Sequence, residues 1–178
     1  MKTNILIIIL LMAGVNMGLH AQTRTSKQEV VTPQLAQKRE DLKKLILKTY
    51  LGIKNSLVIS DAQKTAGYAR EFSNALGQFK FKKLSLEEMN TATTARESIK
   101  KLASQISETK DINEQRKYME KLSEQFWTIA DKVKPENTIL YQQKCPMMGT
   151  TWVSDEKKIE NPYYPKNMLT CGEVIAEK

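Results

Sequence analysis

The chain has 178 residues, a formal net charge of +8, two cysteines and one histidine. That length suits a single domain with a core of useful size. The lysines that produce the charge are interspersed with acids, and no arginine cluster is interleaved with aromatic residues. The composition therefore indicates a solvated surface and argues against a nucleic-acid partner.

The first 21 residues have the layout of a secretory signal peptide, which we expect to be cleaved after Ala21. Lys2 precedes an apolar run of about eleven residues, whereas a membrane-spanning helix needs roughly 20. We therefore expect an exported, periplasmic protein made of residues 22–178, a single domain without stable membrane insertion after cleavage. His20 lies in the removed segment, so the mature chain would contain no imidazole.

Residues 33–134 carry the apolar periodicity of four amphipathic helices, each about 20 residues long. A capping residue stands at each expected start, and the third start has the serine–glutamate spacing of a capping box. The starts are Thr32-Pro33, Ser60-Asp61, Ser85 with Glu88, and Asp111, and the last helix ends near Pro135. Because short links between long helices make neighbours antiparallel, we predict an all-α fold, an up-down-up-down four-helix bundle.

Residues 137–178 lose the helical period and form a different kind of chain. Short segments at 138–141, 150–153 and 168–170 favour extended structure, and Asn161-Pro162 and Tyr164-Pro165 favour turns. We predict a loop-rich C-terminal appendage with one or two short strands, packed on the bundle.

Four sulfur-containing side chains of this tail are candidate metal ligands: Cys145, Met147, Met168 and Cys171. Thiolates and thioethers are soft donors that favour Cu(I) over hard cations, and silver, mercury or zinc could also bind. A zinc site from the two cysteines with Asp155 or Glu173 is possible, but it would leave the methionines unused. Without histidine, blue copper and histidine-based catalytic zinc are excluded.

The alternative for Cys145 and Cys171 is a disulfide, since exported thiols can oxidise. Closing that loop would stabilise the tail by roughly 3–4 kcal/mol in the chain-entropy model. The protein would then be a stapled interaction module that docks on an efflux adaptor or another envelope partner. The two hypotheses are compatible, because oxidation would switch a metal site off.

An enzyme is not expected, and no catalytic residue is proposed. A mature chain without histidine cannot assemble a Ser-His-Asp or Cys-His arrangement, and there is no glycine-rich phosphate loop. Carboxylates such as Glu40, Asp41, Glu87 and Glu88 are expected on solvent-facing helix surfaces.

The tail residues resemble those of one bacterial family. The matching positions, in order, are Cys145-Pro-Met147, Trp152, Ile159, Asn161-Pro-Tyr-Tyr164, Met168 and Cys171-Gly172. The chain resembles an uncharacterised exported domain that also occurs attached to heavy-metal efflux adaptors of the membrane-fusion (CusB-like) type. Helical segments 50–57 and 106–112 are similar as well, and the resemblance covers about residues 40–176.

The resemblance implies an exported helical domain linked to handling of copper or a related metal. It implies Cys145, Met147, Met168 and Cys171 as ligands and an efflux adaptor as partner. The chain departs from the pattern at Pro165, where glycine is usual, and at Tyr118, where a histidine often stands. We therefore expect a periplasmic protein that binds a soft metal for sequestration or efflux.

Overall fold

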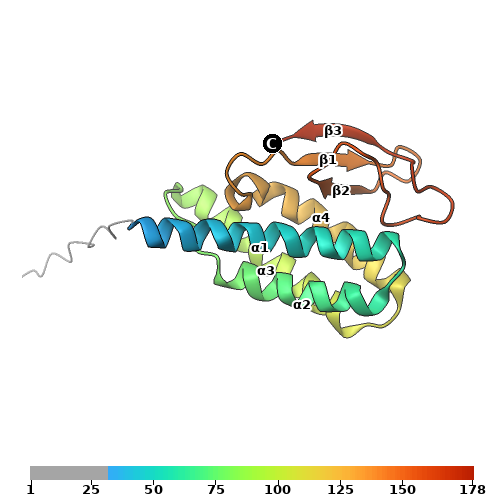
Figure 1. Cartoon of the computed structure of the whole chain (residues 1–178), viewed down its shortest axis with the longest axis horizontal. Coiled ribbons are helices and arrows are strands. Elements are labelled where there is room, and N and C mark those ends of the chain that lie inside the picture. The colour runs from blue at the N-terminus through green and yellow to red at the C-terminus, as the bar shows by residue number, and fades with distance from the viewer. Residues whose placement is uncertain (1–31) are drawn as a thin grey trace, which may run out of the picture. The chain divides into compact units, whose positions relative to one another are not determined.

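The computed structural model describes residues 32–178 (Figure 1). The expected signal peptide, its cleavage site at Ala21 and His20 lie outside these residues. The described chain forms four helices followed by a small antiparallel sheet, as expected from its periodicity. The elements are α1 (Pro33–Val58), α2 (Ala62–Gln78), α3 (Leu86–Glu108), α4 (Ile112–Val133), β1 (Tyr141–Lys144), β2 (Thr151–Ser154) and β3 (Glu173–Glu177). Within residues 32–178, no helix combines the length and the apolarity that crossing a membrane requires.

Each helix begins at a side chain that accepts hydrogen bonds from the first turn. The Thr32 hydroxyl accepts from the Leu35 N–H, and the Asp61 and Asp111 carboxylates cap α2 and α4 in the same way. At α3 the predicted capping box is present, with Ser85 and Glu88 each bonded to the other's backbone N–H. Such caps typically contribute about 1 kcal/mol each, and they confirm the starts expected from the sequence.

The core lies between the four helices and contains the predicted apolar stripes. Each helix packs against the next, and α1 also contacts α4. The Tyr50 and Phe126 rings stack with centroids 4.3 Å apart, and Phe72 meets both rings edge-on. Aromatic pairs of this kind add stability beyond the area that they bury. The helical part is thus a packed core that supports the tail.

The tail forms a three-stranded sheet in the order β2-β1-β3. In the register, Gln143 of β1 faces Trp152 of β2 and Val174 of β3, with an irregularity between Gln142 and Gln143. The strand expected at 168–170 was wrong, because this segment is a turn and the third strand begins at Glu173. There the Met168 N–H donates to the Tyr164 carbonyl, so a local turn satisfies a backbone group that a strand would have paired.

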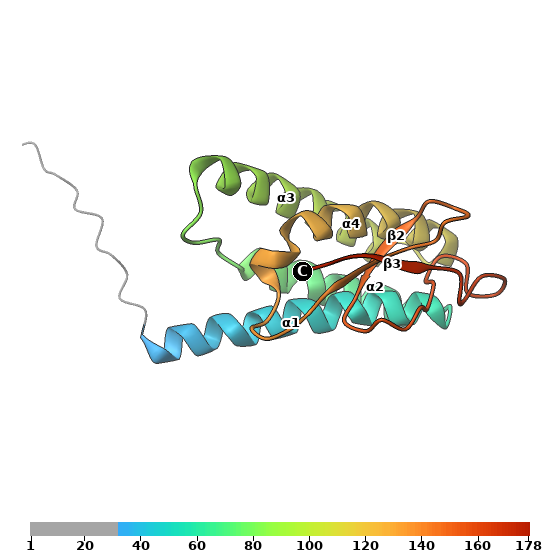
Figure 2. The same cartoon turned by 90° about the horizontal axis from the view of Figure 1, so that it is seen from above.

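A buried polar network joins the sheet to the helices, and β2 is the strand that packs against α4 and α1. Figures 1 and 2 show the sheet on the side of the bundle that these two helices form. The Tyr50 hydroxyl accepts from the Val153 N–H at 3.0 Å and lies 2.8 Å from the Ser123 hydroxyl. The Tyr163 hydroxyl donates to the Thr151 carbonyl at 2.7 Å. These buried bonds fix the tail on the bundle.

A guanidinium group makes a second attachment. Arg116 on α4 donates to the Pro162 carbonyl at 3.0 Å and to the Leu57 carbonyl at 2.9 Å. One side chain thus links the tail, α4 and the last turn of α1. The segment between β2 and β3 is therefore attached to α4 through this side chain.

Candidate functional site

The sulfur atoms of Cys145 and Cys171 lie 3.0 Å apart, although the residues are 26 positions apart in the chain. Both cysteines are free thiols. Cys145 directly follows β1, Cys171 lies two residues before β3, and Lys144 pairs with Glu173 across these strands. The sheet register therefore brings the two thiols together. We call these two residues the cysteine pair.

The 145–150 loop between β1 and β2 wraps around the Cys145 sulfur. The Cys145 N–H donates to the Thr150 carbonyl at 2.9 Å, and the Gly149 N–H donates to the Cys145 carbonyl at 2.8 Å. Gly149 has a φ of +75°, a conformation that glycine adopts readily. The backbone N–H groups of Met147 and Met148 favour the thiolate and lower the pKa of Cys145, and the Met147 N–H acts in the same direction on Cys171. Backbone N–H groups of a turn favour an anionic acceptor.

Asn161 connects the two cysteine segments from the other side and is fully buried. Its amide nitrogen donates to the Cys171 carbonyl at 3.3 Å, and its side chain is one of the groups that lower the pKa of the Cys145 thiol. Its amide oxygen accepts from the N–H groups of Tyr163 and Tyr164 at 2.9 and 3.3 Å. The sequence indicated this asparagine as part of a turn and of the family resemblance, but not as a partner of the cysteines. The signal for its role was an asparagine before a proline, a common turn pattern that does not identify its partners.

Gly172 allows the chain to pass closely over the sheet beside Cys171. A Cβ atom at this position would meet Ile159 Cγ2 at 2.8 Å and Trp152 Cη2 at 2.9 Å. Trp152 is itself fully buried, so it has little room to yield. The absence of a side chain at Gly172 therefore helps to set the height of Cys171 above the sheet.

The pKa values of the two thiols are shifted in opposite directions. Burial raises the pKa of the Cys145 thiol. Hydrogen bonds from Cys171, from two backbone N–H groups and from Asn161 outweigh burial, and the pKa lies below its usual value. The hydrogen bond to Cys145 raises the pKa of Cys171, and burial and the charge of the neighbouring thiolate add to the rise. The first proton therefore leaves Cys145, and the second is held more strongly.

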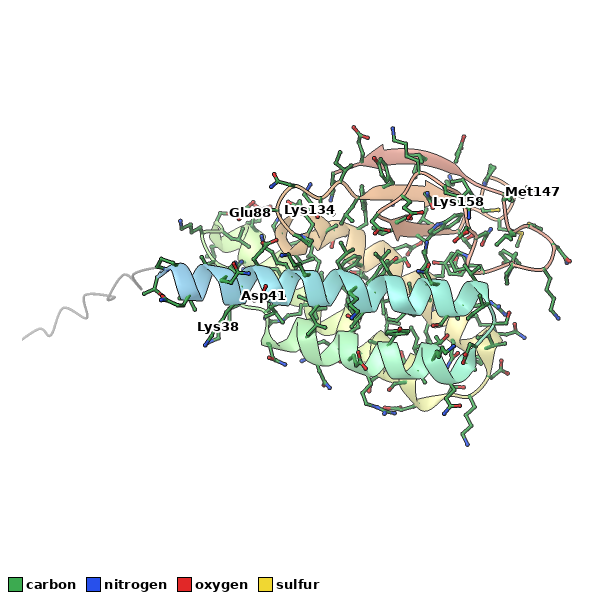
Figure 3. The ribbon with its side chains drawn as sticks, viewed as in Figure 1. Lys38, Asp41, Glu88, Lys134, Met147 and Lys158 are labelled. Atoms are coloured by element: carbon green, nitrogen blue, oxygen red, sulfur yellow. The ribbon has the colours of Figure 1, made fainter. Side chains whose placement is uncertain are left out.

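The predicted methionine ligands lie in different surroundings. Met147 is 72% exposed and lies at the outer rim of the strand region (Figure 3), and the neighbouring Met148 is 46% exposed. Met168 is half-buried and packs against the core, and its carbonyl accepts from the Cys171 N–H at 3.0 Å. Of the four predicted ligands, the structure brings the two thiols together, places Met168 in an adjoining turn and leaves Met147 in solvent.

Carboxylates do not complete a metal site with the cysteine pair in the part of the chain that the structure describes. Asp155 and Glu173, the residues considered for a zinc site, are exposed. Across residues 32–178 there is no group of three or more histidine, cysteine, aspartate or glutamate side chains arranged to hold a metal ion. The cysteine pair by itself offers two soft donors, and further donors have to be thioethers or come from outside the chain.

A comparison with protein families matches residues 46–138 to a family described as "Protein of unknown function (DUF3347)". The match spans most of the helical region and more than half of the chain, and it ends before Cys145. No curated protein and no solved structure matches the chain.

Proposed function

The chain belongs to the DUF3347 family of proteins of unknown function, and we propose that it binds a soft metal ion, Cu(I) first among them, for sequestration or efflux. The observation that carries this proposal is the pair of free thiols with sulfur atoms 3.0 Å apart. Thiolate donors select Cu(I) and similar ions over hard cations. Proximity removes most of the entropy cost of gathering the two donors around one ion.

Binding of the ion would require the two sulfurs of the cysteine pair to move apart. At a metal–sulfur distance of about 2.3 Å, two thiolates on one ion would be separated by up to about 4.6 Å, more than the 3.0 Å between the two sulfurs. Cys145 is held by the 145–150 loop and Asn161, whereas Cys171 is the less buried residue of the pair. The sulfur of Cys171 therefore moves outward when the ion binds.

Met168 and Met147 are the proposed thioether ligands, with unequal roles. Met168 is half-buried in a turn that is hydrogen-bonded to Cys171, which keeps it close to that thiol along the chain. Met147 begins in solvent and has to turn inward over the cysteine pair. We therefore propose Met168 as the third ligand. Met147 would be a further ligand only for ions that bind more than three sulfurs.

The proposed cellular location and the proposed partner rest on the sequence. An exported, periplasmic protein meets soft metals outside the reducing cytosol, and the family resemblance suggests an efflux adaptor as the acceptor of the ion. The up-down-up-down bundle expected from the short helix connections would be the scaffold. Ion binding requires loss of both thiol protons, so the affinity falls as the pH falls.

The test is a titration of reduced, metal-free protein with Cu(I) against a chromogenic chelator. We expect one ion per chain and losses in Cys145→Ser and Cys171→Ser larger than the about 10–100-fold that removal of an outer-shell residue costs. Met148→Leu is the matched control, because it alters an exposed methionine outside the proposed ligand set and keeps the backbone N–H.

A reduced protein that takes up no copper would contradict the metal proposal, as would an affinity unchanged in both cysteine variants. The second candidate function, a disulfide-stapled docking module, would then stand. Its supporting observation is the set of exposed apolar residues in the tail: Leu169, Val174 and Ile175.

A further inference from the structure

Access to the cysteine pair is unequal. Cys145 is fully buried beneath the 145–150 loop, whereas Cys171 is partly exposed. The residues before Cys171, Leu169 and Thr170, are both exposed. A reagent or another protein that approaches the pair therefore meets the sulfur of Cys171 first.

The inner sulfur belongs to a residue that the surrounding loop holds in place. The Cys145 N–H donates to the Thr150 carbonyl at 2.9 Å, and the Cys145 carbonyl accepts from the Gly149 N–H at 2.8 Å. Cys171 lies in the turn before β3, where its N–H donates to the Met168 carbonyl and its carbonyl accepts from Asn161. Cys145 is therefore positioned to react with a bond formed on Cys171, and not directly with an external reagent.

We propose that the cysteine pair performs thiol–disulfide exchange, with Cys171 as the attacking thiol and Cys145 as the resolving thiol. The co-substrate is a disulfide, either of low molecular weight or on another exported protein. The inference goes beyond the proposed function, because the reaction needs no metal ion.

The exchange balances in two steps. The Cys145 thiolate, 3.0 Å away, takes the proton of Cys171 as the Cys171 sulfur attacks one sulfur of the external disulfide. The external S–S bond breaks, a mixed disulfide forms on Cys171, and the thiolate that leaves takes the proton from Cys145. The Cys145 thiolate then attacks the Cys171 sulfur, breaks the mixed disulfide and releases the second thiolate. The chain loses two electrons, the external disulfide gains them, and the two cysteine protons end on the two thiols released.

The distance between the two sulfurs suits the second step. At 3.0 Å, the Cys145 sulfur needs to approach by only about 1 Å to reach the S–S separation of a disulfide. The reverse reaction uses the same unequal access, since an incoming thiolate attacks the more exposed Cys171 and Cys145 departs as a thiolate. Oxidation removes both thiolates, so an ion held by the pair is released when the disulfide forms.

The test uses metal-free, reduced protein, excess glutathione disulfide and acid quenching before mass measurement. Wild-type protein should form the internal disulfide and release two glutathiones per chain, without accumulating a mixed disulfide. Cys145→Ser should stop at a stable glutathione adduct on Cys171. Cys171→Ser should react roughly tenfold more slowly or worse, because Cys145 is buried.

Equal reaction rates in the two variants would overturn the proposal, as would a glutathione adduct on Cys145 of the wild-type chain. A second measurement needs no variant: limiting iodoacetamide on folded wild-type protein should alkylate Cys171 before Cys145, as peptide mapping reports. Alkylation in the opposite order would also overturn the assignment. Because no copper is present, failure of the Cu(I) titration leaves this result unaffected.

Discussion

At the scale of single residues, the cysteine pair depends on side chains that carry no reactive group. Asn161 supplies hydrogen bonds to both cysteine segments and is fully buried. Its oxygen also accepts from a buried and a partly buried backbone N–H in the turn that precedes Cys171. An amide side chain therefore supports the position of the thiols that the sheet register brings together.

Replacing Asn161 with alanine should destabilise the fold and disorder the site together. The N–H groups of Tyr163 and Tyr164 lose their acceptor, and an unsatisfied buried donor costs about 1–3 kcal/mol. Urea unfolding should report that loss in Asn161→Ala. The exposed Asn167 lies on the same segment, and Asn167→Ala should change the free energy of unfolding by less than about 0.5 kcal/mol. Equal effects of the two substitutions would contradict the role given to Asn161.

At the scale of elements, the third strand and the turn before it determine where Cys171 lies. The backbone at Gly172 passes so close to Trp152 and Ile159 that a Cβ atom would lie under 3 Å from both. The strand pairs with β1 on one edge, and its residues Val174 and Ile175 are partly exposed. A substitution at Gly172 should therefore shift the neighbouring Cys171 directly, without a rearrangement of the helices.

Gly172→Ala should destabilise the protein by about 1–3 kcal/mol, because the added methyl group overpacks a buried contact. It should also slow formation of the internal disulfide, since Cys171 is pushed away from Cys145. Gly67→Ala is the matched control: it lies in α2, and a Cβ atom there meets nothing within 4 Å. That control should be neutral or stabilising by up to about 1 kcal/mol. A neutral Gly172→Ala in urea unfolding would show that the contact is not as close as described.

The joint between the helices and the sheet should make stability depend on alkaline pH. Burial raises the pKa of Tyr50 to about 12, although hydrogen bonds with Ser123 and the Val153 N–H oppose the rise. The unfolded pKa is about 10, so folding favours the neutral phenol. The contribution is therefore fully present below pH 10 and is lost as the pH rises toward 12.

The full contribution amounts to about 2–3 kcal/mol, and urea unfolding between pH 8 and 11 should show the loss of about half of it. Tyr50→Phe keeps the stacked ring on Phe126 but removes the ionisable group, so its stability should fall less steeply with pH. Buried Tyr163, whose pKa burial also raises, remains in that variant and contributes in the same direction. Identical slopes for the variant and the wild type would contradict the burial of the Tyr50 hydroxyl.

At the scale of the whole molecule, the helices could be predicted and the geometry of the site could not. Caps such as Ser85 with Glu88 and apolar residues at helical spacing act over three or four positions, so they are legible in the sequence. The turn at 168–170 was misassigned as a strand, because Met168 and Leu169 have apolar side chains that suit either structure. Likewise, Met147 was expected beside the thiols, but the turn completed by Gly149 leaves its side chain in solvent.

The family comparison covers the helices but not the part of the tail that contains the cysteine pair. The family match ends at residue 138, so the cysteine pair lies beyond the segment that places the chain in its family. Buried Trp152 and Val153 nevertheless belong to the same core as the helices. The tail is thus an integral part of the fold, and its chemistry has to be tested in the full chain.

X-ray absorption at the copper edge of the Cu(I)-loaded full chain would show which atoms bind the ion. We predict one copper per chain in a sulfur-only shell at about 2.3 Å, with two thiolates and a thioether that disappears in Met168→Leu. A copper shell dominated by nitrogen or oxygen, or a sulfur shell that persists in the double variant Cys145→Ser/Cys171→Ser, would contradict it.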